Sequence, residues 1–112
     1  MWKSKLEFNP ILALTINEPI IGIYRGTRKV EKINSLLHTV EMDGTLFDIY
    51  GCGSLDAQLA KEDENGVIVQ ATEPDIKVKI LYAGKKMATV DIGGRDMKKE
   101  VHNYVVYTEE NE

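Results

Sequence analysis

The segment 35–51 restricts the fold of this chain more than any other part of the sequence. Two runs rich in apolar, β-branched and aromatic residues flank the dipeptide Asp43-Gly44. A type I′ turn requires positive φ at both central residues, and Asp followed by Gly reaches that conformation at low cost. The segment therefore predicts a tight antiparallel hairpin. Alternation along its second strand places Phe47 and Ile49 in the core and turns Tyr50 outward.

One helix and three further strands are expected around this hairpin. Upstream, a strand is predicted over 20–27, where two glycines indicate a bulge or a sharp bend. Downstream the period changes, because Leu55 and Leu59 share one helical face, and we predict a short helix over 54–62 with Ser54 as its N-cap. The last two strands are predicted over 76–81 and 101–107. The glycines between these two strands bracket a loop or a protruding hairpin.

The resulting order is strand, strand, strand, helix, strand, strand. This order predicts an all-β fold with one short helix, a five-stranded Greek-key barrel of the OB type with the helix between strands 3 and 4. Other small barrels and an α+β sandwich share the order and stay open as alternatives. The length of 112 residues fits one domain. We assign that domain to 1–108, with 1–18 as an N-terminal extension packed on or near the barrel and 109–112 as an acidic tail.

Cysteine usage and hydropathy point to a cytoplasmic protein, in the host cytoplasm if the chain is viral. A single cysteine, Cys52, cannot form a disulfide within the chain. No run of eighteen apolar residues could span a membrane, and residues 1–5 lack the features of a secretory signal. We expect no membrane partner.

The charge of the chain is unevenly distributed. The formal net charge is −4, with acidic clusters at 62–64 and at the C-terminus. Between Arg25 and Lys32 four cationic side chains accompany one carboxylate, and between Lys77 and Lys99 seven accompany two. We refer to these stretches as the first and second basic windows. In the predicted fold they fall on the connections between strands 1 and 2 and between strands 4 and 5, which flank the ligand cleft of an OB barrel.

Four short stretches carry a family resemblance. They read Gly-Ile-Tyr-Arg-Gly-Thr-Arg at 22–28, Tyr-Gly-Cys-Gly-Ser-Leu-Asp-Ala-Gln-Leu at 50–59, Ile-Leu-Tyr-Ala-Gly-Lys at 80–85 and Asn-Tyr-Val-Val at 103–106. In these places the chain resembles the small OB-fold single-stranded DNA-binding proteins of bacteriophages and related mobile elements. Tyr50 stands where that family usually has tryptophan, and Asn103-Tyr104 stands where it has Asp-Phe.

The resemblance implies sequence-tolerant binding of single-stranded DNA in viral or mobile-element replication or recombination. It also implies that an acidic tail recruits replication proteins, a role that Glu109, Glu110 and Glu112 could fill here, although solubility alone also explains such a tail. Single strands are held by cations along the phosphates and by aromatic rings that stack on bases. The candidate binding residues on this basis are Tyr24, Arg25, Arg28, Lys29, Lys32, His38, Tyr50, Tyr82, Lys85, Lys86, Arg95 and Lys98. Tyr104 is assigned to the core.

The sequence offers no pattern typical of an enzyme, a metal site or a cofactor site. It has no phosphate-binding glycine loop followed by Lys-Ser or Lys-Thr, and its two histidines and one cysteine lack metal-ligand spacing. We expect no catalytic residue, metal or cofactor. Two alternatives stay open for function: an OB-fold protein-interaction module of a replication or virion complex, and an RNA-binding protein. A homodimer through edge strands is also compatible with the pattern.

Overall fold

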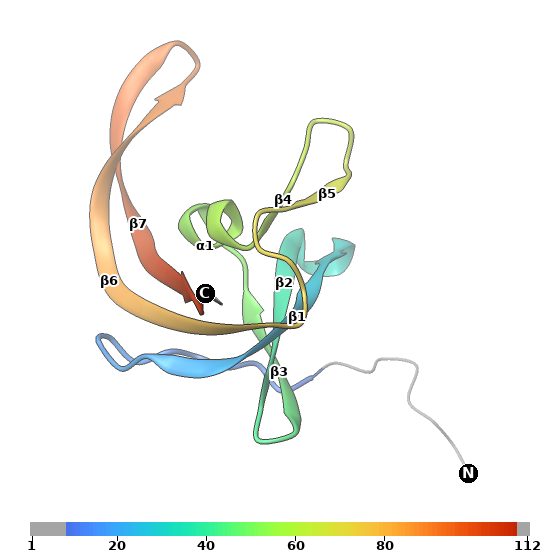
Figure 1. Ribbon diagram of the computed structural model, residues 1–112. Coiled ribbons are helices and arrows are strands. Elements are labelled where there is room, and N and C mark those ends of the chain that lie inside the picture. The colour runs from blue at the N-terminus through green and yellow to red at the C-terminus, as the bar shows by residue number, and fades with distance from the viewer. Residues whose placement is uncertain (1–8, 110–112) are drawn as a thin grey trace.

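The computed structural model describes residues 9–109 and consists mostly of β-structure with one short α-helix (Figure 1). The elements are β1 (Ile20–Val30), a 3-10 turn η1 (Glu31–Ile33), β2 (Ser35–Met42), β3 (Thr45–Tyr50), α1 (Gly53–Gln58), β4 (Ala60–Glu62), β5 (Ile68–Gln70), β6 (Ile76–Ile92) and β7 (Arg95–Thr108). Residues 1–8 of the predicted extension, and Glu110 and Glu112 of the predicted tail, lie outside the described residues.

Five strands form one antiparallel sheet in the order β3-β2-β1-β6-β7, and β4 and β5 form a separate two-stranded sheet. The β2–β3 turn confirms the predicted hairpin, since Asp43 and Gly44 have φ values of 52° and 78°. Gly26 lies at an irregularity in the pairing of β1 with β2, which confirms that glycine marks a bulge in this strand. The expected helix lies between the third and fourth strands of the large sheet.

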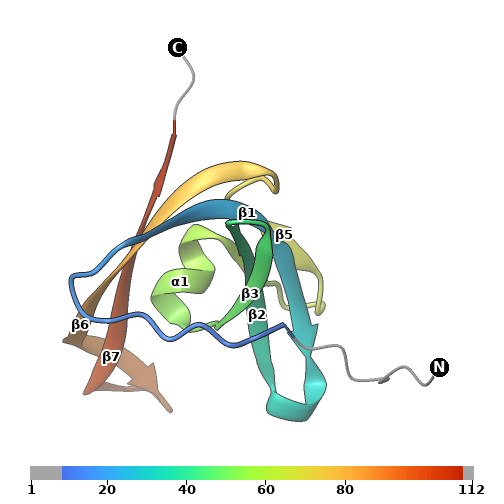
Figure 2. The same ribbon diagram turned by 90° about the horizontal axis from the view of Figure 1, so that it is seen from below.

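The large sheet does not close into a barrel within residues 9–109. Its edges are β3 and β7, which do not pair with each other. The short helix α1 packs against β7 and lies inside the curve of the sheet (Figure 2). The prediction of five strands and a helix in this order is therefore confirmed, whereas the finer prediction of a closed OB barrel is not shown.

Two side chains of α1 bind the free backbone edge of β7. Ser54 Oγ donates to the carbonyl of His102 at 2.9 Å and accepts from the amide of Tyr104 at 3.0 Å. Gln58 Nε2 donates to the carbonyl of Tyr104 at 2.7 Å, and Gln58 Oε1 accepts from the amide of Val106 at 2.8 Å. A side-chain amide thus takes the place of a neighbouring peptide group. These contacts satisfy edge groups that strand pairing would satisfy in a closed barrel.

The opposite edge, on β3, is covered by residues that precede β1. The amide of Asp48 donates to the carbonyl of Pro10 at 2.9 Å, and its carbonyl accepts from the amide of Leu12 at 2.8 Å. Further along, the amide of Asn17 donates to the carbonyl of Tyr82 at 2.9 Å. The segment therefore connects the β3 edge with β6, and Figure 2 shows it crossing in front of α1.

The core lies between the curved sheet and α1. Its buried hydrophobic members are Tyr24, Val40, Ile49, Leu55, Leu59, Val78 and Ile80. Phe47 is half-buried, Tyr104 packs against the core, and Tyr50 is 50% exposed. The positions of Ile49, Tyr50 and Tyr104 agree with the predictions. The prediction that Phe47 lies in the core is wrong, because Phe47 is not among the residues that pack against this cluster, whereas Asp48, on the other face of the strand, is fully buried.

The predicted extent of the helix is wrong at its C-terminal end. The helix ends at Gln58, and residues 60–62 pair with β5 instead of continuing it. The carboxylate of Asp63 accepts hydrogen bonds from the amides of Asn65 and Val67, which organises a tight turn between β4 and β5. The predicted N-cap is also wrong, because Cys52 occupies that position and the Ser54 hydroxyl binds β7.

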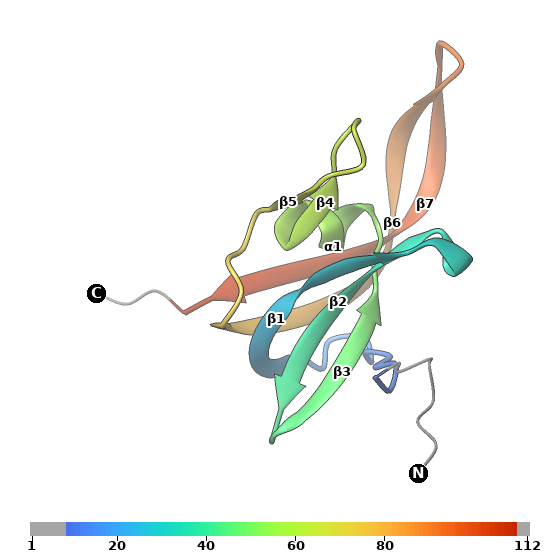
Figure 3. The ribbon, with the colours of Figure 1, turned by 90° about the vertical axis from the view of Figure 1, so that its right-hand side faces the viewer.

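The long strands β6 and β7 continue beyond the sheet as a projecting two-stranded ribbon (Figure 3). A bulge between Tyr82 and Lys85 separates this ribbon from the core part of the strands. Its turn is formed by Gly93 and Gly94, with φ values of 61° and 82°. Of the two predicted alternatives, the connection is a protruding hairpin. We call residues 85–102 the arm.

Candidate nucleic-acid interface

The cations of the first basic window are mostly neutralised by ion pairs. Arg25 lies 2.6 Å from Asp75 and 3.1 Å from Glu41, and the ammonium of Lys29 lies 2.8 Å from Glu62. These carboxylates hold the pKa of Arg25 above its ordinary value. Lys32 is exposed and forms no ion pair with a described residue. Most of this window is therefore committed to contacts within the fold.

Arg28 binds a fully buried carboxylate. Its guanidinium lies 2.6 Å from Asp48 Oδ2, and Thr39 Oγ1 donates to Asp48 Oδ1 at 2.7 Å. Burial opposes ionisation of Asp48, but hydrogen bonds from Arg28, Thr39 and Asn9 outweigh it and lower the pKa of the carboxyl. An uncompensated charge at this depth would be costly, so Arg28 has a structural task.

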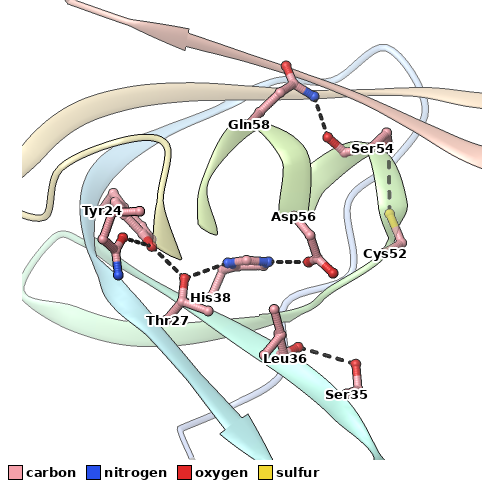
Figure 4. A network of polar contacts seen from close by, with 10 residues as sticks. Tyr24, Thr27, Ser35, Leu36, His38, Cys52, Ser54, Asp56 and Gln58 are labelled. Carbon is pink, nitrogen blue, oxygen red and sulfur yellow. Dashed lines mark hydrogen bonds and ion pairs between the residues drawn. The ribbon is translucent and has the colours of Figure 1, made fainter. Parts of the chain in front are cut away.

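Tyr24 and His38 lie in the interior, as part of a chain of hydrogen bonds (Figure 4). The Tyr24 hydroxyl contacts Thr27 Oγ1, which lies 2.7 Å from His38 Nδ1, and His38 Nε2 lies 2.6 Å from Asp56 Oδ1. Burial raises the pKa of Tyr24. The relative exposure of both Tyr24 and His38 is 0%. Their expected role as ligand contacts does not fit these positions, because neither side chain presents a surface to solvent.

Most of the second basic window lies in the arm, and the cations of the arm are free of ion pairs with described residues, whereas Lys77, outside the arm, lies 3.9 Å from Glu109. Within residues 9–109, no carboxylate lies within 4.0 Å of the charged groups of the five arm cations. These cations are Lys85, Lys86, Arg95, Lys98 and Lys99. All five residues are exposed. The arm is therefore the main source of unpaired positive charge in the described chain.

The pairing register sorts the arm side chains onto two faces, because paired residues on antiparallel strands point to the same side. One face continues from the core side of Tyr82 and Tyr104, and we call it the inner face. Its members are Lys85, Met87, Thr89, Asp91, Asp96, Lys98, Glu100 and His102. The outer face consists of Lys86, Ala88, Val90, Ile92, Arg95, Met97, Lys99 and Val101. All three carboxylates of the arm lie on the inner face. The outer face has three cations and no carboxylate.

Aromatic rings cluster at the base of the arm. The rings of Tyr82 and Tyr104 lie 4.8 Å apart between centroids, and the centroid of His102 lies 5.6 Å from that of Tyr82. The hydroxyl of Tyr82 is 2.7 Å from His102 Nδ1. Tyr82 is half-buried and His102 is exposed, so the cluster has one open side. It offers a stacking surface beside arm cations.

A hollow of about 450 Å³ lies between the start of α1 and the arm. The side chains around it include Lys86, Lys99 and His102 of the arm, the carboxylate of Glu100, and Ser54 of α1. A second hollow of about 460 Å³ is lined by residues just before and just after η1, including Lys29, and by residues of α1 and β4. Gly53 lines both, so the hollows adjoin at this residue. The two basic windows thus approach neighbouring hollows, although Lys29 is neutralised by Glu62.

Two candidate residues were not selected from the sequence: Lys99 and His102. Both lie in the part of β7 that was predicted as the end of a loop or the start of a strand. The signal that identifies them is the register of β6 with β7, which pairs Lys85 with His102 and Ala88 with Lys99. Tyr50 is exposed as expected, but it lies at the end of β3 and is not among the residues that line either hollow.

Comparisons with known protein families, with curated proteins and with solved structures find no match for this chain. In the described part of the chain, no helix has the length and apolar character needed to cross a membrane. No cluster of three or more potential metal ligands occurs among residues 9–109.

Proposed function

We propose that this protein binds single-stranded DNA, without strong sequence preference, at the base of the arm. The observation that carries the proposal is the hollow beside α1, which is lined by two unpaired lysines and by His102, and His102 is itself a member of the aromatic cluster with Tyr82 and Tyr104. Lys86 and Lys99 would contact phosphates, and the open side of Tyr82 and His102 would contact bases. Cations and stacking together are the two terms that hold a single strand.

The biological setting rests on the resemblance to phage and mobile-element proteins. It places the binding in viral or mobile-element replication or recombination. The acidic tail would then recruit replication proteins. Two alternative functions differ from this proposal in the ligand. An RNA-binding protein would bind a strand that carries 2′-hydroxyl groups, and a protein-interaction module would bind a polypeptide.

The direct test is fluorescence anisotropy of a labelled oligo-dT as a function of salt. Binding should weaken steeply with salt, and Lys86→Gln/Lys99→Gln should lower the salt slope by roughly 1.4, since each phosphate contact on a single strand contributes about 0.7. The matched control is Lys32→Gln/Lys98→Gln, which removes the same charge from exposed positions that line neither hollow. Equal losses in both variants, or no binding at low salt, would refute the proposed site.

The stacking surface is tested by Tyr82→Ala. Loss of a stacking ring weakens binding by about 1–3 kcal/mol. Tyr82→Phe keeps the ring and should retain binding, which separates stacking from the hydrogen bond to His102. Tyr107→Ala removes a half-exposed ring on the other side of β7 and should have no effect. A matched RNA oligonucleotide, and a pull-down that survives nuclease treatment, separate the two alternatives from the proposal.

A further inference from the structure

Besides Lys86 and Lys99, which belong to the single-strand site, the outer face of the arm carries residues that this site does not explain. The cations of this face lie among Ala88, Val90, Ile92, Met97 and Val101, and no carboxylate shares the face. Ile92 and Met97, close to the turn, are 54% and 50% exposed. No aromatic residue occurs between positions 86 and 101, so this surface lacks the rings on which unpaired bases stack.

This face needs a partner on physical grounds. An isolated two-stranded ribbon is marginal in water, and additional strands or packing against a helix normally stabilise it. Within residues 9–109, β6 pairs with β1 only from Ile76 to Ile80, which leaves the arm without a third strand. An exposed apolar row flanked by cations is typical of a binding surface.

The charge of the face selects among partners. A second copy of the arm would place like charges opposite one another, because the only charged residues of the outer face are the cations Lys86, Arg95 and Lys99. Insertion of the tip into a lipid surface would desolvate Asp91 and Asp96, which are cross-strand neighbours on the inner face next to the turn. A ligand that engages one face only, and that carries regular negative charge, avoids both costs.

We propose that the outer face of the arm binds a groove of double-stranded DNA, with Ile92 and Met97 as an apolar wedge at the base pairs. A two-stranded ribbon fits the DNA groove, and cationic arms with isoleucine or methionine wedges kink duplexes by partly unstacking a base step. Arg95 contacts phosphates, while Asp91 and Asp96 face away from the groove. This site extends the protein to duplex segments beside a single strand, and it does not depend on the single-strand site.

The test uses the full chain and a duplex of about 25 base pairs labelled at both ends for energy transfer. The parent protein should bind the duplex and shorten the end-to-end distance. Ile92→Ser/Met97→Ser should abolish the shortening, and Arg95→Gln should lower the salt slope of binding by about 0.9. Matched controls are Met87→Ser and Lys98→Gln, which alter exposed side chains of the inner face and should leave both readouts unchanged.

Three results would overturn the inference. They are absence of duplex binding at about 50 mM salt, equal effects of inner-face and outer-face variants, and binding of phosphatidylserine vesicles but not of the duplex. Circular dichroism of each variant confirms that the sheet is intact. Because Ile92, Arg95 and Met97 lie outside the hollow, their variants should keep oligo-dT binding, so failure of this proposal and failure of single-strand binding give different results.

Discussion

The contact between Gln58 and the edge of β7 yields the sharpest prediction about stability. The side-chain amide forms three hydrogen bonds: Nε2 donates to the carbonyls of Ser54 and Tyr104, both at 2.7 Å, and Oε1 accepts from the amide of Val106 at 2.8 Å. A hydrogen bond contributes about 0.5–1.5 kcal/mol net. Gln58→Ala should therefore lower the free energy of unfolding by about 2–4 kcal/mol, because it also leaves edge groups of β7 without partners.

Gln58→Glu provides a more specific version of this test, because it preserves the shape of the side chain and replaces the donating NH₂ group with an oxygen of an ionisable carboxyl. An ionised carboxylate still accepts from Val106 but faces the carbonyl oxygens of Ser54 and Tyr104, whereas the protonated acid can donate to one of them. The fold therefore favours the protonated form and raises the pKa of the introduced carboxyl. Stability is retained below the unfolded-state pKa of about 4.3 and falls as pH rises towards the folded-state pKa.

Urea denaturation of parent and variants at pH 4.5 and pH 8 measures this effect. The deficit of Gln58→Glu relative to the parent should grow with pH by about 1.4 kcal/mol for each unit by which the pKa is raised. Ala57→Glu is the control, because it adds the same charge at an exposed neighbouring position of α1. The reasoning is refuted if Gln58→Glu shows the same pH dependence as this control, or if Gln58→Ala costs less than about 1 kcal/mol.

The other predictions concern the ion pair between Arg28 of β1 and Asp48 of β3, and the glycines Gly22 and Gly53. Arg28→Ala leaves the buried carboxylate of Asp48 unpaired and should destabilise the fold by about 2–4 kcal/mol in urea titrations, less than a fully buried pair because Arg28 is 40% exposed; Asp48→Asn in the same chain should recover part of the loss. Because the fold lowers the pKa of Asp48, its contribution is present above pH of about 4 and is lost as pH falls further, so acid unfolding of Asp48→Asn should show a shallower pH dependence than the parent. Gly22→Ala should lower the melting temperature, at a cost of about 1–3 kcal/mol, because the added Cβ would lie 2.6 Å from Val40 Cγ1 and 2.7 Å from the carbonyl of Glu41. Gly53→Ala meets open space and should leave the melting temperature nearly unchanged.

Local signals in the sequence predicted the elements whose causes are themselves local. The Asp43-Gly44 turn, the positions of Ile49 and Tyr50 on β3, and the position of the helix follow from turn chemistry and side-chain period. The open edge of the sheet could not be predicted in this way. It depends on Ser54 and Gln58 meeting backbone groups of β7 nearly fifty residues away, and the local sequence predicts only an N-cap role for Ser54.

The candidate site shows the same division. The charge count identified the second basic window, five of whose seven cations lie in the arm. The charge count could not show that the cations of the first window are neutralised. In that window Arg25, Arg28 and Lys29 have carboxylate partners from distant parts of the chain. Tyr24 and His38 were selected as residue types suited to a ligand, but the fold places them in the core. Only the strand register could show which face of the arm Lys98 and Lys99 each occupy.

The strand β6 belongs to two environments at once. It supplies Val78 and Ile80 to the interior and then runs on, without a chain break or a loop, into the exposed ribbon. A ligand that binds the arm therefore binds the same continuous strand that supplies side chains to the core. Binding of a ligand to the tip of the arm should therefore slow amide exchange at Val78 and Ile80, because the same strand connects the tip with the core.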